Sequence, residues 1–366
     1  MNIEGKITSV EYETGSNITL EEIDIKELDI NSSPTCFLLN MSKSKVAVSK
    51  WVSPKRTRSY PYERVYNTLS TSKKITVIPV VKDEGATGDR DFIQWDTIAL
   101  MSLLDVYVIP AYYVDAQKRI TSSGKQKITK QKLDNDFIIK ELKKIPNYHS
   151  SALHWNLKQI KGLSRVVTKV KSNYQNIAKK TGVKLKSEKG IDDFLNKIEA
   201  GAKSFMDFSR IKASDAQKRE FVTMQPKEAL STATKAKITI KNYLGGLYYF
   251  TVDEVELKNN VLKLIEAKHT ASGKLPSKGD IKDGLLKMIL YCNLEDVTVE
   301  GLECNTTPVL KLTSSKMKGK LTEESNNSTR KKFYEENMIS ESERMFLNSL
   351  FGEAKNNTFE IILENG

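Results

Sequence analysis

The residues with the clearest chemical potential are Asp253, Glu266 and Lys268. They lie in two runs, 248–257 and 261–269, whose β-branched and aromatic residues are typical of β-strands. Carboxylate oxygens are the ligands that Mg²⁺ prefers, and Mg²⁺ commonly binds through them together with a substrate phosphate. Such an ion polarises a phosphoryl oxygen and lowers the pKa of a bound water. A neighbouring lysine can orient that water or stabilise transition-state charge, so the three residues indicate metal-assisted phosphoryl chemistry.

The turn between the two runs predicts which side chains share a face. The runs meet at Asn259-Asn260, and asparagine tolerates the positive φ angles of a two-residue type I′ turn. Lys258 then pairs with Val261, and the same register places Asp253 opposite Glu266. The lysine two residues further on shares that face because side chains alternate along a strand. The register gives these two carboxylates no cross-strand ion-pair partner, so they should repel each other unless a cation lies between them.

This segment resembles the PD-(D/E)xK nuclease superfamily. The resemblance is based on Asp253, the hairpin, the Glu-Ala-Lys tripeptide and the apolar run 262–265 that precedes the tripeptide. The resemblance implies that Asp253 and Glu266 bind Mg²⁺ and that the carbonyl of Ala267 completes the metal site. It also implies that Lys268 is the catalytic lysine.

The resemblance covers roughly residues 240–312, and Val252 stands where the family name has proline. It implies that 280–291 forms the helix after the catalytic hairpin and that 309–312 is a further core strand. An additional carboxylate on a helix often joins such sites, and three candidates remain open: Glu63, Asp96 and Glu228.

The strand and helix patterns on either side of this hairpin predict a mixed α/β (α+β) fold. We expect a restriction-endonuclease-like central mixed sheet flanked by helices, with a large helical insertion and an N-terminal β-rich region. The expected regions are 1–73, β-rich with a basic loop; 74–125, a strand–helix–strand unit; 126–235, helical; 236–312, the catalytic core; and 313–366, a linker, a helix and a strand. Within the helical region, apolar residues recurring at helical spacing over 153–177 predict one long helix that ends before Gly182.

Composition narrows the class of protein. The 366 residues include 58 Lys and Arg against 46 Asp and Glu, a formal net charge of +12. This charge favours a nucleic-acid partner and a merely soluble, lysine-rich surface about equally. The three cysteines form no CxxC pair, and no phosphate-loop motif or N-terminal signal pattern is present. We therefore expect a cytoplasmic protein with no membrane association.

A basic, aromatic segment over residues 50–64 is a candidate DNA-binding surface because arginine forks bind phosphate or guanine and aromatic rings pack on sugar or base. The candidate DNA-binding residues in it are Lys55, Arg56, Arg58, Tyr60 and Arg64. The alternative for each of these residues is a structural role in a surface loop. A cluster of acids is an alternative metal site, although no lysine follows it at the Glu-x-Lys spacing: Asp83, Glu84, Asp89, Asp91 and Asp96.

As a whole, the chain resembles a type II restriction endonuclease. This implies a Mg²⁺-dependent, sequence-specific enzyme that hydrolyses phosphodiester bonds in double-stranded DNA. It also implies a homodimer, since two active sites must reach two strands, and a cognate DNA methyltransferase in the same system. Two alternatives stay open: another nuclease of the superfamily acting in DNA repair or phage defence, and a non-catalytic nucleic-acid-binding protein.

Overall fold

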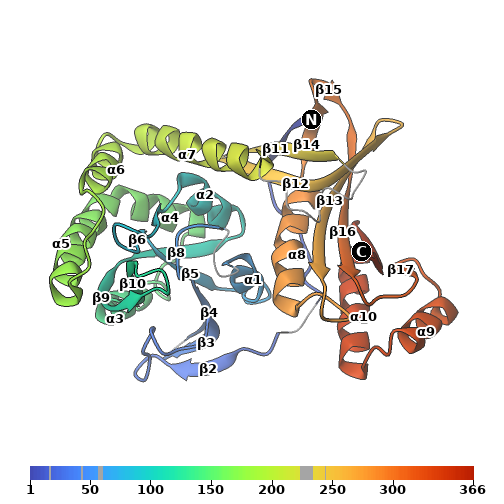
Figure 1. Cartoon of the computed structure of the whole chain (residues 1–366), viewed down its shortest axis with the longest axis horizontal. Coiled ribbons are helices and arrows are strands. Elements are labelled where there is room, and N and C mark those ends of the chain that lie inside the picture. The colour runs from blue at the N-terminus through green and yellow to red at the C-terminus, as the bar shows by residue number, and fades with distance from the viewer. Residues whose placement is uncertain (16–17, 43, 57–60, 223–233, 244) are drawn as a thin grey trace. The chain divides into compact units, whose positions relative to one another are not determined.

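The computed structural model describes residues 1–15, 18–42, 44–56, 61–222, 234–243 and 245–366. The chain divides into two compact units (Figure 1). Unit 1 comprises Met1–Ile18 and Lys212–Gly366, and unit 2 comprises Thr19–Ile211. The expected mixed α/β class with a large mixed sheet is confirmed. None of the helices in these ranges is both long enough and apolar enough to cross a membrane.

Unit 1 is built on a mixed sheet that has nine strands among the described residues, in the order β15-β14-β1-β11-β12-β13-β16-β18-β17. The parallel neighbours are β1 with β11, β13 with β16, and β16 with β18; the other pairs are antiparallel. The strands are β1 (Asn2–Ile7), β11 (Thr234–Asn242), β12 (Leu247–Lys258), β13 (Val261–Thr270), β14 (Glu295–Val299), β15 (Leu302–Glu303), β16 (Asn305–Ser314), β17 (Lys320–Thr322) and β18 (Glu360–Asn365).

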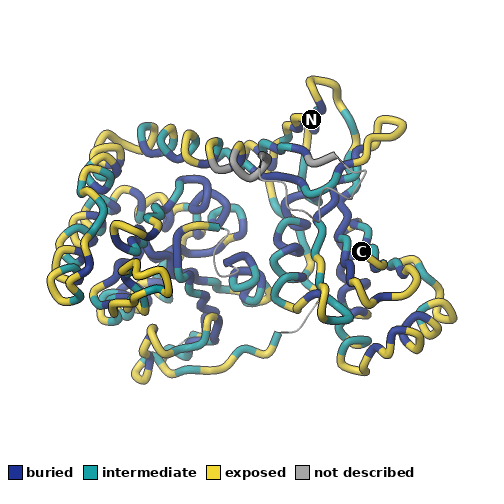
Figure 2. Tube along the Cα trace, viewed as in Figure 1, coloured by how far each residue is buried: buried dark blue, intermediate teal, exposed yellow. Residues whose placement is uncertain are grey.

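Helix α8 (Lys278–Cys292) packs against β13 and β16 of this sheet (Figure 1). Its start is fixed by Ser277, whose hydroxyl accepts a hydrogen bond from the Asp280 amide. Apolar side chains such as Leu285 and Ile289 bury its sheet-facing side, and the strands beneath it are largely buried (Figure 2). Helix α9 (Asn327–Glu336) packs on β17, and α10 (Glu341–Asn356) packs on β18.

The two units group the chain differently from the five regions expected from the sequence. Strand β1 pairs with β11, so the N-terminal strand belongs to the sheet that carries the hairpin, whereas the other strands of 1–73 belong to unit 2. The linker expected at the start of region 313–366 contains strand β17. These strands pair with segments that are distant in sequence, and local sequence patterns do not reveal such pairing.

Unit 2 has a five-stranded sheet in the order β2-β3-β4-β5-β8 and two small hairpins, β6–β7 and β9–β10. Its strands are β2 (Glu21–Asp24), β3 (Cys36–Met41), β4 (Ser44–Lys50), β5 (Lys74–Pro79), β6 (Val81–Asp83), β7 (Arg90–Phe92), β8 (Val106–Ala111), β9 (Tyr113–Ile120) and β10 (Gln126–Leu133). The helices in its range are α1 (Pro61–Tyr66), α2 (Trp95–Leu103), α3 (Asn135–Leu142), α4 (Ala152–Lys161), α5 (Leu163–Thr181) and α6 (Lys189–Glu199), with α7 (Ala202–Val222) continuing past its last residue.

Two expectations within unit 2 are wrong. The first residues of the expected helical region form strand β10, which pairs antiparallel with β9 across a turn in which Gly124 has φ +73°. The expected long helix is interrupted at Gly162, which separates α4 from α5. In α5 the expected stripe is buried, whereas in α4 Leu157 is exposed and the buried face is formed instead by residues such as Trp155 and Ile160. The end of α5 at Gly182, with φ +66°, is as expected.

Candidate active site

The hairpin β12–β13 has the register expected from its turn. Asn259 and Asn260 have φ angles of +51° and +62°, as a type I′ turn requires. The strand pairing runs from Lys258–Val261 to Glu254–Ile265. The pairing of β12 with β13 ends one residue before Asp253 and Glu266, so these two residues lie just beyond the last pair.

Asp253 connects the two strands beyond that point. Its Oδ2 accepts a hydrogen bond from the backbone N–H of Ala267 at 3.0 Å. This hydrogen bond holds the Asp253 carboxylate against the strand that carries Glu266 and Lys268, and these three residues therefore lie together as the sequence predicts. Ala267 takes part through its N–H, and the role of its carbonyl as a metal ligand stays a prediction.

Glu266 is paired with two lysines, which corrects the expectation that it has no ion-pair partner. Its side chain is 1% exposed. Lys268 Nζ lies 2.9 Å from Oε1, and Lys287 Nζ lies 2.7 Å from Oε2. The hairpin register did not predict this arrangement because Lys287 comes from α8, which packs across the sheet face.

Helix α8 also adds an acid to this cluster, which already contains Asp253 and Glu266. Asp283 Oδ2 lies 3.5 Å from Lys268 Nζ. Neither Asp283 nor Lys287 is among the site residues expected from the sequence. Their spacing of four residues places them on one face of the helix, and an Asp–Lys pair at that spacing, on the helix that follows Glu-x-Lys, is a signal that could have identified them.

Gly284 allows this helix to approach the hairpin closely. A Cβ atom at this position would lie 2.9 Å from Leu310 Cδ1 and 3.2 Å from Lys268 Cε. Any other residue would therefore press on the side chain of Lys268. The glycine is explained by close packing rather than by a special backbone angle.

Within this cluster the pKa values of Asp253 and Glu266 shift in opposite directions. Burial raises the pKa of Asp253 to about 7, and the negative charge of Glu266 adds to that rise. Burial also acts to raise the pKa of Glu266, but the ammonium groups of Lys287 and Lys268 outweigh it and lower the pKa to about 2. Burial acts to lower the pKa of each lysine, yet Glu266 keeps the pKa of both raised. Glu266 is thus firmly ionised near neutral pH, whereas Asp253 is poised to lose its proton.

The carboxylate oxygens of Asp253 and Glu266 fit Mg²⁺, provided that Asp253 is deprotonated. Both are oxygen ligands on a rigid hairpin, and a carboxyl group must lose its proton before it binds a metal ion. Among the described residues, no three His, Cys, Asp or Glu side chains form a group that could hold a metal ion.

The other candidate carboxylates are not among the described residues of this cluster. Glu63 in α1 and Asp96 in α2 belong to unit 2, and Glu228 lies outside the described residues. In the alternative acidic cluster, Asp83 is buried and lies 2.5 Å from Arg90 Nη2. An ion pair of this kind gives Asp83 a structural role.

The expected DNA-binding segment has mixed roles in the structure. Lys55 is exposed and Arg56 is partly buried, and Arg58 and Tyr60 lie outside the described residues. Arg64 donates a hydrogen bond from Nη1 to the Lys50 carbonyl at 2.8 Å, and burial lowers its pKa. Arg64 therefore stabilises the fold of unit 2 in this structure.

No family model, no curated protein and no solved structure matches the chain. The functional interpretation therefore depends on the residues and geometry of the site.

Asp253→Asn is expected to stabilise the protein, and more at pH 8 than at pH 5. A carboxyl group whose pKa is higher in the folded state binds its proton more tightly there, so its ionisation lowers stability. For Asp253 this destabilisation begins above the ordinary aspartate pKa of 3.8 and is complete above about 7. Asparagine keeps an oxygen for the Ala267 N–H and removes the destabilisation.

Thermal unfolding should show a melting temperature higher by on the order of 5 °C at pH 8 and by about half of that at pH 5. Glu254→Gln is the matched control, because Glu254 lies 3.0 Å from Lys311 Nζ and its neutralisation removes an ion pair. A destabilised Asp253→Asn variant at pH 8 would contradict the raised pKa.

Proposed function

We propose that the chain is a Mg²⁺-dependent, sequence-specific DNA endonuclease of the PD-(D/E)xK superfamily, acting as a type II restriction enzyme on double-stranded DNA. The observation that carries the proposal is the convergence of Asp253, Glu266 and Lys268 on one hairpin. The proposed restriction-endonuclease-like fold is supported by the order of elements: an antiparallel hairpin, then α8, and, after β14 and β15, β16 parallel to β13.

The residues of the site have distinct parts in the proposed reaction. Asp253 and Glu266 would hold Mg²⁺, which supplies charge stabilisation and a water of lowered pKa when bound. Lys268 lies 2.9 Å from Glu266 and would orient the attacking water and offset the negative charge that develops at the scissile phosphate. Asp283, 3.5 Å from Lys268 Nζ, would hold that ammonium group in position.

The proposal extends to partners. Cleavage of both strands of a palindromic site calls for two active sites, so we propose a homodimer. A host that carries such an enzyme must protect its own DNA, so we propose a cognate methyltransferase in the same system and a cytoplasmic location.

Incubation of supercoiled plasmid with Mg²⁺ or with EDTA tests the proposal. We expect discrete fragments in Mg²⁺ and intact plasmid in EDTA. Smears or nicks would favour another nuclease of the superfamily. A gel shift without cleavage would favour a non-catalytic binding protein and would overturn the proposal.

The cleavage rate is expected to rise with pH up to about 7 and then to level off. Protons compete with Mg²⁺ for Asp253, whose pKa is about 7 in the absence of metal. A higher Mg²⁺ concentration should therefore shift the midpoint of the pH profile to lower pH. Rates measured from about pH 5.5 to about pH 8.5 at two Mg²⁺ concentrations check this. A midpoint that does not change with Mg²⁺ would mean that Asp253 is not a metal ligand.

A further inference from the structure

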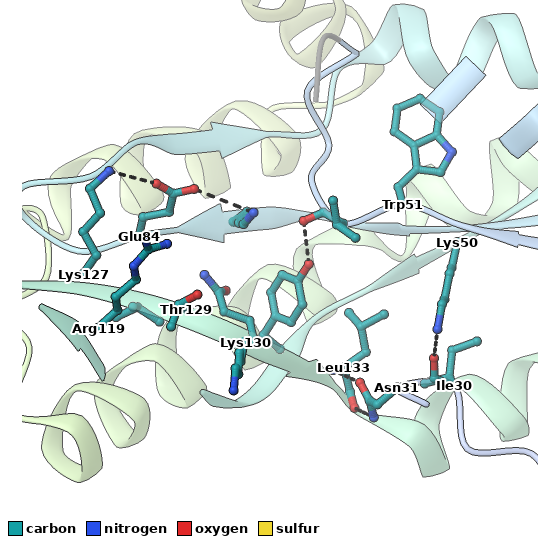
Figure 3. Close-up of a pocket in the computed structure, with 15 residues that line it drawn as sticks. Ile30, Asn31, Lys50, Trp51, Glu84, Arg119, Lys127, Thr129, Lys130 and Leu133 are labelled. Atoms are coloured by element: carbon teal, nitrogen blue, oxygen red, sulfur yellow. Dashed lines mark hydrogen bonds and ion pairs between the residues drawn. The ribbon is translucent and has the colours of Figure 1, made fainter. Parts of the chain in front are cut away.

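Unit 2 contains a pocket of about 360 Å³ (Figure 3), and its lining includes no residue of β12 or β13. It is lined by residues that follow β4, by β6 and by the β9–β10 hairpin. Its charged lining consists of five basic side chains and one carboxylate: Lys50, Lys82, Arg119, Lys127, Lys130 and Glu84. The volume lies within the range typical of small-ligand sites, roughly 300–1,000 Å³.

The single carboxylate does not balance this positive charge. Glu84 is shared between two lysines, with Lys82 Nζ at 3.7 Å and Lys127 Nζ at 3.5 Å. Arg119 and Lys130 are exposed residues on the hairpin that forms one wall. The pocket therefore has an excess of cations, and an anion would relieve their mutual repulsion.

A β-bulge directs part of the hairpin to the pocket. Thr129 pairs with Gln117, and the next pair joins Lys132 to Asp115, so strand β10 has one residue more than β9 between the two pairs. Lys130 lies within this bulge at φ +47°, a left-handed angle that is unfavourable for a residue with a side chain. Bulges commonly redirect side chains next to functional sites, and Lys130 lines the pocket.

We propose that this basic pocket binds the phosphate group of a nucleotide unit. Lysine and arginine are the usual donors to phosphate, and the pocket is large enough for a phosphate with its attached sugar. The phosphate could come from a DNA strand or from a free mononucleotide. The site belongs to unit 2 and contains no residue of the β12–β13 hairpin, so its occupancy does not depend on the proposed nuclease activity.

The test measures binding to the full-length protein in EDTA, where no cleavage is needed. The probes are dTMP, followed by calorimetry, and a fluorescent DNA duplex of about 16 base pairs, followed by anisotropy at two salt concentrations. The variants are Lys127→Ala and Lys130→Gly. Glycine adopts a φ of +47° readily, so Lys130→Gly should keep the fold, which thermal unfolding verifies. Lys158→Ala, an exposed lysine on α4 outside the pocket, is the control.

Each pocket variant is expected to weaken phosphate binding by about tenfold, whereas the control is unchanged. If DNA supplies the phosphate, duplex affinity falls, and the slope of log K against log salt decreases by about 0.9 for each phosphate that is no longer neutralised. If a free nucleotide supplies it, dTMP binding falls while duplex affinity is unchanged. The proposal is overturned if folded Lys127→Ala and Lys130→Gly bind both probes as tightly as wild type.

Discussion

Lys268→Ala is expected to reduce the rate of DNA cleavage by about three orders of magnitude and to leave DNA affinity nearly unchanged. The lysine ammonium lies 2.9 Å from the Glu266 carboxylate, where it would act on the water and phosphate rather than on base edges. Asp253→Ala should have an effect of similar size because it removes a proposed metal ligand. Single-turnover cleavage in Mg²⁺ and gel shifts in EDTA separate the two properties.

Glu254→Ala is the control for this experiment. Glu254 neighbours Asp253 in β12, but its side chain points to the opposite face and lies 3.0 Å from Lys311 Nζ. We expect its cleavage rate to stay within about threefold of wild type, since a partly exposed ion pair contributes little. An inactive Glu254→Ala together with an active Asp253→Ala would show that the reactive face has been assigned incorrectly.

The second large effect is expected from Lys287→Met, which should lower the free energy of unfolding by about 3 kcal/mol. Glu266 is 1% exposed, and Lys287 Nζ is its partner at 2.7 Å. Removal of this ammonium leaves a buried negative charge with only Lys268 to compensate it. Denaturant unfolding at neutral pH measures the decrease in stability, and Lys331→Met, at an exposed position in α9, shows what a methionine substitution costs by itself.

A double variant identifies the cause of that decrease. In Glu266→Gln/Lys287→Met the buried charge is absent, so we expect much of the stability to return. The decrease would instead be due to packing if the double variant were no more stable than Lys287→Met. Cleavage is uninformative for the double variant because Glu266 is itself a proposed metal ligand.

The geometry of the hairpin could be predicted from its local sequence. Asn259 and Asn260 specify a tight turn through their tolerance of positive φ, and side-chain alternation then places Asp253, Glu266 and Lys268 together. Turn chemistry and alternation act over a few neighbouring residues, so they can be read directly from the chain. The helix over 280–291 and the strand over 309–312, which the resemblance implied, lie within α8 and β16.

Tertiary structure alone decided what surrounds the hairpin. Lys287 reaches Glu266 because α8 packs on β13 and β16, and Gly284 permits the close approach. Arg64, expected on a DNA-binding surface, instead donates to a backbone carbonyl inside unit 2. Strand β1 joins β11 from the far end of the sequence. These interactions join residues remote in sequence, and their free energy depends on burial and charge in the folded state, which no local pattern encodes.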